Sequence, residues 1–520
     1  MTRINTKVPS LISQRVLGAN NNALNDSLER LSTGLRINRG KDDPAGLIAS
    51  QNLRAEKGSI TQAISNAERA DQVVNIAEGG LNEISGLLTE LQSLVTATAN
   101  TAGLSVEEKE ANQLQIDSIL QTIDRVASAT SFQGTKLLNG TFDYTVSSVA
   151  GAVDNFKVNG AKIEFNGKLD VDVVVTQSAQ VGGFLLSFGA ASGIDLGGSG
   201  SGGADKQFVM EIAGALGSRE LSFASGTSTA DIAAAINTFT DVTGVKANVS
   251  GSDGGVRLES TERGNAEFVS VKVVDAGGIA SSNGIYRLDA GDSDAYDSST
   301  AAVAFSAASN ALIDKGQDVQ ATINGIKATT RGTIARINTD FLDVEIDLKY
   351  DTSTPSAADV GAISAFTITG GGADFQLAGK VDIGGKVSVG ISNVAVREIG
   401  IDTLTIKDSS GSDVTKTLNL NDLRAGADLN VVDGDLAAAQ KIVDKSIREV
   451  SALRGRLGSF QQNTIGATIR SLGVAMENTS AAESIIRDAD FAAETAGLTR
   501  SQVLVSSAQN TLSQIGRAHV

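Results

Sequence analysis

The chain of 520 residues has no cysteine and no tryptophan, and it has only three prolines and one histidine. Without cysteine it can form no disulfide, no thiolate metal site and no thiol nucleophile. The one histidine, His519, stands next to the last residue, which argues against a histidine-based metal site or a catalytic triad. We therefore predict a protein that is not an enzyme and holds no metal or cofactor.

Basic charge and long apolar runs are also scarce. The formal net charge is −17, which disfavours a nucleic-acid partner. No apolar run approaches the roughly 18 residues of a membrane-spanning helix, so we expect no membrane partner, and the first ten residues lack the apolar stretch of a secretory signal. The rest of the composition, 41% hydrophobic and 20% charged, is that of a folded chain, and its length predicts several domains.

Glycine divides the chain into two ends and a middle. Of the 56 glycines, 11 lie in residues 1–140 and 6 in residues 441–520, so the 300 residues between them hold 39. The prolines are Pro9, Pro44 and Pro355, which leaves the long terminal segments almost free of helix breakers. The ends are therefore expected to be helical.

Both ends carry apolar seams with the alternating three- and four-residue spacing of paired helices. The longest seam consists of Ala63, Ala67, Ala70, Val74, Ala77, Leu81, Ile84, Leu88, Leu91 and Val95. A shorter one precedes it: Leu17, Leu24, Leu28, Leu31 and Leu35. The C-terminal seams are Val443, Ile447, Val450, Leu453, Leu457 and Phe460, then Ile465, Ile469, Leu472 and Met476, and last Leu498, Val505, Ala508 and Leu512. We infer long amphipathic helices whose stripes pair with each other or with neighbouring subunits.

Capping residues separate the N-terminal helices. Asp43 is a natural N-cap and Pro44 fits the first helical position, so we expect one helix to end near Arg39 or Gly40 and a second to start at Pro44. A third helix is predicted from about Val106 to Ala129. Its apolar face consists of Ile116, Leu120, Ile123 and Ala127.

The middle, from about residue 143 to 430, is predicted to be β-rich because short stretches of alternating apolar and polar residues recur there. One helix is expected at Ala230–Phe239, capped by Ser228 or Thr229, and the Gly/Ser-rich stretch 197–203 is typical of a flexible link. The expected strands are 157–165, 171–175, 208–212, 221–223, 245–249, 256–258, 268–274, 319–323, 341–348, 366–368, 387–391 and 404–406.

Several stretches resemble the signatures of bacterial flagellins. At the N-terminal end these are 27–38 (SLERLSTGLRIN) and Lys41–Leu47 (KDDPAGL). At the C-terminal end they are 463–467 (NTIGA), 477–484 (ENTSAAES), 486–491 (IRDADF) and 498–500 (LTR). In the middle, 208–275 more loosely resembles the insertion module shared by flagellins and hook-associated proteins.

The resemblance implies an α+β multidomain fold. Long N- and C-terminal helices would pair as a coiled-coil and helical-bundle core, with a β-rich variable domain inserted between them. Residues 1–43 and 471–514 would form the inner core, 44–142 and 431–470 the outer core, and 143–430 the variable surface region, with an insertion-like module at about 207–275. The last six residues, 515–520, look like the read-through of a sequencing adapter.

The same resemblance implies a structural subunit that polymerises into the extracellular flagellar filament for swimming, after unfolded export through the flagellar type III channel. Its partners would be copies of itself, sister flagellins, an export chaperone, the filament cap and hook-associated proteins. The residues expected to pack between helices or subunits are Leu24, Leu28, Leu31, Leu35, Val74, Leu81, Ile84, Leu88, Leu91, Val95, Ile465, Ile469, Leu472, Leu498, Val505 and Leu512. A hook–filament junction protein and a surface adhesin are the alternatives.

Host immune receptors are further candidate partners. Glu29–Ser50 resembles the flagellin peptide that plant receptors recognise, which marks Arg36, Asn38, Lys41, Asp42, Asp43, Gly46 and Leu47 as candidate epitope residues. For the animal toll-like receptor we expect weak activation, because Glu90 and Gln92 stand where strongly recognised flagellins have Arg.

Three weaker motifs have simpler interpretations. Gly198, Gly200 and Gly203 match a nucleotide-binding pattern but lie in a Gly/Ser tract with no helix after it. Asp292, Asp294 and Asp297 fit a calcium loop poorly, so a solvated acidic loop is expected. Gly385-Lys386 is followed by Val387 rather than Ser or Thr, and is therefore no P-loop.

Overall fold

The computed structural model describes residues 8–100, 103–164, 167–188, 194, 196, 206–250, 255–279, 284–287, 303–349, 360–407 and 413–517. The chain forms two compact units, each made from separate stretches of sequence. The first contains Met1–Lys136, Asp374–Val387 and Val394–Val520, and the second contains Leu137–Ala373 and Ser388–Asn393. Among the described residues, no helix is both long and apolar enough to cross a membrane.

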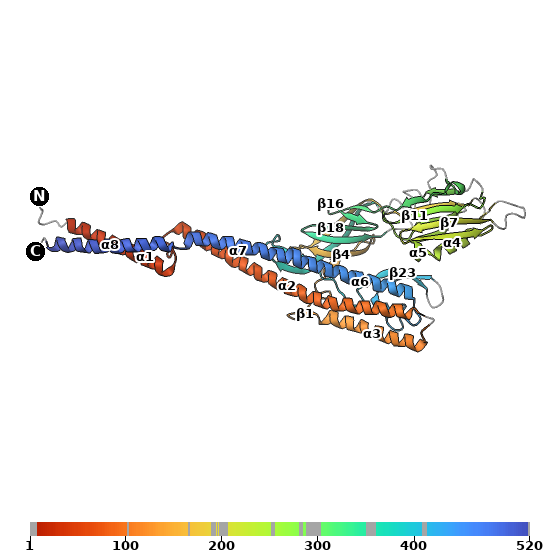
Figure 1. Ribbon diagram of the computed structural model, residues 1–520, viewed down its shortest axis with the longest axis horizontal. Coiled ribbons are helices and arrows are strands. Elements are labelled where there is room, and N and C mark those ends of the chain that lie inside the picture. Colours follow the sequence, from red (N-terminus) through yellow and green to blue (C-terminus); the bar gives the residue numbers. More distant parts are fainter. Residues whose placement is uncertain are drawn as a thin grey trace. The chain divides into compact units, whose positions relative to one another are not determined.

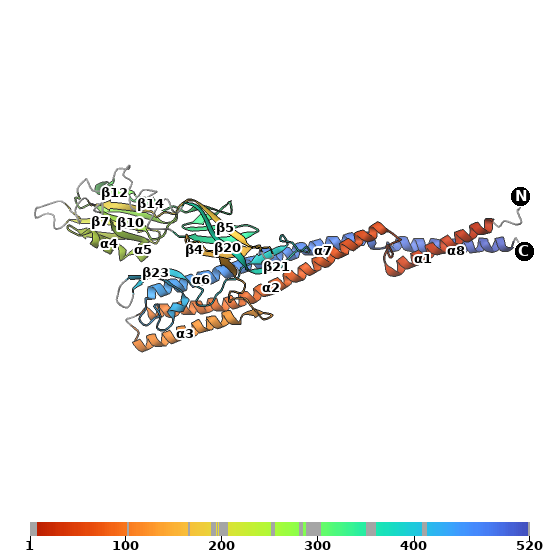
Figure 2. The same cartoon turned by 180° about the vertical axis from the view of Figure 1, so that it is seen from behind.

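The first unit pairs the two ends of the chain, as predicted. Helix α1 (Val8–Thr33) packs on α8 (Phe491–Arg517), and α2 (Pro44–Thr98) packs on α3 (Val106–Ala129), α6 (Leu436–Ser459) and α7 (Gly466–Arg487). Figures 1 and 2 show the N-terminal helices, in red and orange, beside the C-terminal helices, in blue. The start of α1 and the end of α8 lie at the same end of their pair.

The 55-residue helix α2 starts where its capping residues predict. The side chain of Asp43 accepts a hydrogen bond from the amide of Gly46, and Pro44 takes the first helical position. The whole predicted seam from Ala63 to Val95 is buried. Helix α3 matches its predicted bounds and buries its expected apolar face, and Ser105 and Glu108 form a capping box at its start.

The end of α1 is a correction to the sequence-based expectation. The helix ends at Thr33 rather than near Arg39 or Gly40. Gly34 adopts φ 72°, and its amide donates to the carbonyl of Arg30 at 2.8 Å. The left-handed conformation ends the helix, and glycine occupies this position because residues with a Cβ rarely adopt that conformation. Leu35, which the seam assigned to the helix, therefore lies in the loop that follows.

Shorter elements complete the first unit around α2, α3 and α6. Gln113 on α3 donates to the carbonyl of Leu423 and accepts from the amide of Val431, so the segment before α6 is tied to α3. Asp124 on α3 pairs with Arg424 at 2.9 Å. These elements are β1 (Ser131–Phe132), β2 (Thr135–Lys136), β23 (Asp402–Lys407), β24 (Asp413–Leu418), η2 (Leu420–Leu423) and the π-turn η3 (Phe460–Ile465). Two more strands, β21 (Ala373–Gln376) and β22 (Lys386–Val389), include residues of both units.

The second unit contains two packed pairs of antiparallel sheets, as expected for a β-rich middle. One pair has the strand orders β16-β15-β5-β20-β3 and β17-β18-β19-β4, and its inner faces share one apolar core. These strands are β3 (Tyr144–Ser147), β4 (Val153–Ala161), β5 (Leu169–Gln177), β15 (Gln320–Ile323), β16 (Ile326–Lys327), β17 (Thr329–Arg331), β18 (Ile334–Asn338), β19 (Leu342–Leu348) and β20 (Gly361–Gly371).

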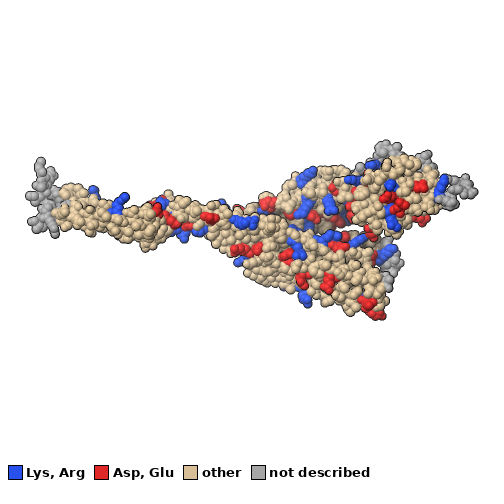
Figure 3. Space-filling view, in the orientation of Figure 1, with Lys and Arg blue, Asp and Glu red and all other residues tan. Residues whose placement is uncertain are grey.

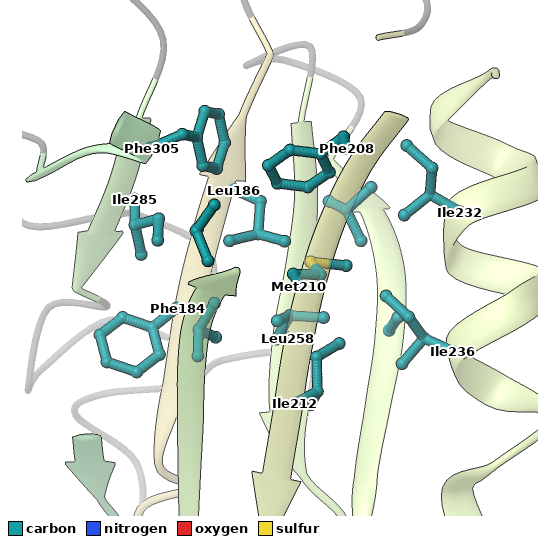
Figure 4. Close-up of a cluster of buried hydrophobic side chains, with 14 of the residues drawn as sticks. Phe184, Leu186, Phe208, Met210, Ile212, Ile232, Ile236, Leu258, Ile285 and Phe305 are labelled. Carbon is teal, nitrogen blue, oxygen red and sulfur yellow. The ribbon is translucent and has the colours of Figure 1, made fainter. Parts of the chain in front are cut away.

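The other pair has the orders β13-β12-β6-β10-β9 and β14-β11-β7-β8. Phe184, Phe208 and Met210 lie in its core, which α4 closes with Ile232 and Ile236 (Figure 4). Ser228 caps α4, as predicted. The elements are β6 (Gly183–Ser187), β7 (Gln207–Gly214), β8 (Ser218–Ala224), α4 (Thr229–Asn237), α5 (Thr240–Thr243), β9 (Val245–Ser250), β10 (Gly255–Ser260), β11 (Phe268–Asp275), β12 (Gly284–Arg287), β13 (Val303–Ala304), η1 (Phe305–Ala307) and β14 (Leu312–Lys315).

The second sheet pair is an insertion into the first. Its chain leaves after β5 and returns before β15, and the two connections meet at Gln180 and Gln317. The amide of Gln180 donates to the carbonyl of Gln317 at 2.8 Å, and the amide of Gln317 donates back at 3.0 Å. Residues 181–316 therefore begin and end at adjacent points.

Candidate subunit-packing surface

The α1–α8 pair leaves its heptad seam partly open. Leu17, Leu24 and Leu31 on α1 are only partly buried, and α1 has no fully buried residue. On α8, Leu498, Val505 and Leu512 are likewise partly exposed. A pair of isolated helices covers each seam from one side only, so water still reaches the apolar side chains.

Charged side chains are rare on this pair. The 26 residues of α1 include only Arg15, Asp26, Glu29 and Arg30 as charged residues. On the face shown in Figure 3, charged residues are sparse over the α1–α8 pair and more frequent elsewhere. Arg30 pairs with Glu494 of α8 at 3.1 Å, which is the ion pair between these two helices in the described part of the chain.

A second group of apolar side chains on the terminal helices is strongly exposed, and of its members only Leu28 belongs to the predicted set. Leu11 is 64% exposed and Phe491 is 69% exposed, and Val8, Ile12 and Val16 continue the stripe on α1. The signal in the sequence is the apolar spacing at the start of α1, which runs beside the predicted seam. The exposed members on α1, α7 and α8 are Val8, Leu11, Ile12, Val16, Leu28, Val474, Ile485, Phe491, Val503 and Leu504.

Apart from Leu35, the other predicted packing residues lie in the chain's own helical bundle. Ile469 and Leu472 are partly buried on α7, and Leu35 is partly buried in the loop after α1. The fully buried members are Val74, Leu81, Ile84, Leu88, Leu91, Val95 and Ile465. Helix α2, which carries all of them but Ile465, packs on α3, α6 and α7 of the same chain, so this seam is closed without a neighbour.

Two loops connect the α1–α8 pair to the bundle around α2, and together they form what we call the joint. The loop after α1 and the loop after α7 lie antiparallel, with a bridge between Leu35 and Asp488. The amide of Arg36 donates to the carbonyl of Arg487 at 2.7 Å, and the amide of Ala489 donates to the carbonyl of Gly34 at 2.9 Å. The guanidinium of Arg36 also donates to the carbonyl of Ile486. The loop between α1 and α2 and the loop between α7 and α8 are therefore held together by hydrogen bonds.

The candidate epitope residues organise this joint. The carboxylate of Asp42 accepts from the amides of Arg39 at 2.8 Å and Asn38 at 3.1 Å. The hydrogen bond from the Arg39 amide, more than any other cause, lowers the pKa of Asp42 below its usual 3.8. Lys41 lies 3.9 Å from Asp26 of α1.

The start of α2 adds two further contacts. The amide of Leu47 donates to the carbonyl of Asp43 at 2.9 Å. A Cβ on Gly46 would lie 2.4 Å from the Asp43 carboxylate and 2.7 Å from the end of the Ile37 side chain, so a larger residue would displace the Asp43 cap. These residues therefore have a structural role in the folded chain.

The weaker motifs gain no support as ligand sites. Gly385 lies in the turn between β21 and β22, where its amide donates to Asp382 at 2.6 Å. The glycines Gly198, Gly200 and Gly203, the aspartates Asp292, Asp294 and Asp297, the proposed link at 197–203 and His519 lie outside the described residues. Within the described ranges, no three His, Cys, Asp or Glu residues gather as a metal would require.

The fold and this surface define a class: a fibre subunit whose paired chain ends expose an apolar seam beside an internally closed helical bundle. Models of known families match both ends. The bacterial flagellin N-terminal helical region matches residues 4–143, the bacterial flagellin C-terminal helical region matches 440–519, and the flagellin hook IN motif matches 207–262.

Curated relatives match this chain along nearly its whole length. Flagellin B of Helicobacter pylori is 24% identical over 98% of this chain and 97% of its own length. A flagellin of Salmonella choleraesuis is 28% identical over the same shares. The chain belongs to the bacterial flagellins, and it is a structural subunit of the flagellar filament outside the cell.

Solved structures of flagellar proteins are more distantly similar. The cap protein domains of Serratia marcescens are 20% identical and cover 40% of this chain and 99% of their own, with a TM-score of 0.23. The flagellar junction protein of Legionella pneumophila is 12% identical and covers 85% of this chain and 99% of its own, with a TM-score of 0.24. At these TM-scores the structures add nothing to the assignment, which rests on the sequence comparisons.

Proposed function

We propose that α1 and α8 drive polymerisation by burying their open seam and exposed stripe against neighbouring subunits. The carrying observation is that α1 has no buried residue and that α8 has none among residues 491–514, whereas α2 buries 14. Each large apolar side chain that leaves water contributes about 1.5–3 kcal/mol. The exposed apolar side chains on α1 and α8 therefore favour association, while α2 and its partners keep the monomer folded.

In this proposal the domains follow the predicted division. Residues 1–43 and 471–514 form the inner core, 44–142 and 431–470 the outer core, and 143–430 the variable surface region. Sister flagellins, the filament cap, hook-associated proteins and an export chaperone are proposed partners, because each would meet the same exposed terminal helices during export or growth.

Unfolded export through the type III channel is part of the same proposal. The absence of cysteine supports it, because no disulfide can block threading. The weak closure of the α1–α8 pair supports it as well, because little stability is lost when these helices unfold.

Growth on filament seeds tests the role of the terminal helices. A variant that lacks residues 1–33 should fail to elongate seeds, while its remaining helices unfold at an unchanged temperature. The matched control replaces residues 181–316, whose ends meet at Gln180 and Gln317, with a short glycine linker. The control should still elongate seeds. Growth without residues 1–33 would refute the proposal, and loss of growth in the control would mean that the inserted β-region also takes part in assembly.

Recognition by plant receptors is proposed for the segment Glu29–Ser50. In support of it, Arg36, Lys41 and Asp42 expose their side chains even in the folded joint. A synthetic peptide of Glu29–Ser50 should trigger an oxidative burst in leaf tissue, and a peptide with Asp42→Ala and Asp43→Ala should not. An inactive parent peptide would refute recognition without affecting the assembly proposal.

A further inference from the structure

One turn of the C-terminal helical segment, which runs from α6 through η3 to α7, is not α-helical. Between α6 and α7, η3 is a π-turn in which the amide of Gly466 donates to the carbonyl of Gln461, five residues back. A π-turn holds one residue more than an α-turn, and it occurs mostly as a single turn within a longer α-helix. Its position between two long helices raises the question of what it does there.

The buried seam changes phase across this turn. In α6, Val443, Val450 and Leu457 are buried at intervals of seven residues. The next buried residue, Ile465, follows Leu457 after eight. One residue corresponds to a rotation of about 100° in an α-helix, which is enough to turn a seam away from its partner.

Helix α7 keeps the new phase. Leu472, Thr479 and Ile486 follow Ile465 at intervals of seven residues and are all partly buried. Residues that would continue the phase of α6 point away instead, because Val474 is 58% exposed and Ile485 is 82% exposed. The extra residue therefore decides which face of α7 meets α2.

The partner helix shows no such step. Along α2, the buried residues Ile60, Ala67, Val74, Leu81 and Leu88 keep a constant interval of seven, and they extend to both sides of the stretch that Gln461 contacts. The phase change is therefore confined to the C-terminal helical segment and is not found in α2.

Before and at the start of η3, successive hydrogen bonds to α2 are separated by the same number of residues on both helices. Arg454 donates to Glu78 and Asn82 at 2.9 Å each. Gln461 lies seven residues later and donates to Asp71 at 2.8 Å and Asn75 at 2.9 Å, which lie seven residues earlier on α2. As far as Gln461, the C-terminal helical segment and α2 therefore use equal numbers of residues between contacts.

Beyond η3 the spacing is no longer matched. The hydroxyl of Thr61 contacts the sulfur of Met476 at 3.5 Å. Met476 lies fifteen residues after Gln461, whereas Thr61 lies ten and fourteen residues before Asp71 and Asn75. Between these two contacts, the C-terminal helical segment therefore contains at least one residue more than α2.

We propose that η3 is a register corrector, which takes up one surplus residue so that α6 and α7 present a single continuous seam to α2. Its start is anchored, since Gln461 is bonded to α2 and the ring of Phe460 lies 6.2 Å from that of Phe375. Gln462 and Asn463 are exposed and lie where the surplus is taken up. The proposal concerns folding within one chain and does not depend on how subunits associate.

Single-residue deletions in the full-length chain test the proposal. Deleting Gln462 removes the surplus, so η3 becomes an α-turn and both seams keep their faces. The thermal midpoint, followed by circular dichroism, should shift by less than about 3 °C. Deleting Ala452, which is also exposed but lies within α6, moves Arg454 and Gly458 to the seam positions of Leu453 and Leu457. That midpoint should fall by at least about 8 °C. Equal losses, or a small shift in both variants, would overturn the proposal.

A cross-linking measurement reads the register itself. Because the chain has no cysteine, Thr61→Cys and Met476→Cys introduce the only thiols. The oxidised pair should form in the same yield with and without Gln462, since α7 keeps its position on α2. A yield that drops at least fivefold after the deletion would contradict the proposal even if the variant remains folded.

Discussion

Two regions of the first unit carry the same kind of heptad seam and bury it to different extents. Around α2, the seam residues Leu81, Ile84, Leu88 and Leu91 are each 0% exposed. In the α1–α8 pair, the equivalent leucines remain partly exposed, and α1 has no buried residue. Heptad spacing identifies a helix face that needs cover, but the number of surrounding helices determines whether one chain can supply that cover.

The difference has an energetic consequence. Ordering a helix costs conformational entropy whether or not its seam is buried. Helix α2 offsets this cost with contacts to three helices, whereas in the described part of the chain α1 packs chiefly on α8. The α1–α8 pair is therefore expected to gain its stability from neighbouring subunits, and the bundle around α2 to be stable in the monomer.

Placing a charge on the exposed stripe should have the largest effect on assembly. Leu11→Asp is expected to raise the critical concentration for filament growth at least about tenfold, because a side chain worth about 1.5–3 kcal/mol on burial would become charged. Gln14→Asp on the same helix is the matched control and should change it by less than about twofold. The monomer should unfold at the same temperature in both variants. Normal growth of the Leu11 variant would show that this stripe is not covered in the filament.

Truncating the closed seam should act on the monomer instead. Leu88→Ala is expected to lower the free energy of unfolding by about 2–5 kcal/mol, because it leaves a cavity among three helices. Leu87→Ala, one residue away and only partly buried, should cost less than half as much. Urea unfolding of the monomer measures both changes. Similar losses at the two positions would mean that the bundle is not closed as described.

Two glycines of α1 and its loop should respond to alanine with opposite signs. Gly34→Ala forces a Cβ into a conformation at φ 72° and should destabilise the filament by about 1 kcal/mol. Gly18→Ala lies within α1, where nothing lies within 4 Å of the added Cβ, and should stabilise it by about 0.5–1 kcal/mol. The temperature of filament dissociation reports both. Two shifts of the same sign would contradict the helix end at Thr33.

The smallest effect is expected from the charge in the joint. Since the pKa of Asp42 is lowered in the folded chain, its contribution to stability is present above pH 3.8 and is lost as the pH falls through the folded pKa. Filaments with Asp42→Asn should therefore dissociate more readily than the parent at neutral pH, and the difference should vanish in stronger acid. A difference that persists at the lowest pH would assign the effect to geometry rather than charge.

Local signals in the sequence predict much of this architecture. The Asp43–Pro44 pair sets the start of α2, and Val106–Ala129 is found with its predicted bounds. The predicted end of α1 is too late, because Leu35 continues the apolar spacing although Gly34 has already ended the helix. Some strand pairings in the second unit, such as β19 with β4 and β20 with β5, join residues far apart in the sequence, so no local pattern reveals them.

The packing surface is predictable only in part, for the same reason. The spacing locates the seams of α2 and α8 but does not tell that α2 is closed within the chain while α1 is open. The stripe from Val8 to Val16 is missing from the predicted set because it runs beside the seam that starts at Leu17. The interval of eight residues from Leu457 to Ile465 is visible in the sequence, yet only the hydrogen bond to Gln461 identifies it as a π-turn.

Amide hydrogen exchange, compared between monomer and filament, tests the central claim most directly. The amides of α1 and α8 should exchange within seconds in the monomer and become protected by at least about 100-fold in the filament, which corresponds to roughly 2.8 kcal/mol. The amides of α2 from Ala63 to Val95 should be protected equally in both states. If α1 and α8 were already as protected as α2 in the monomer, their seam would need no neighbour, and its burial could not be what drives the filament to grow.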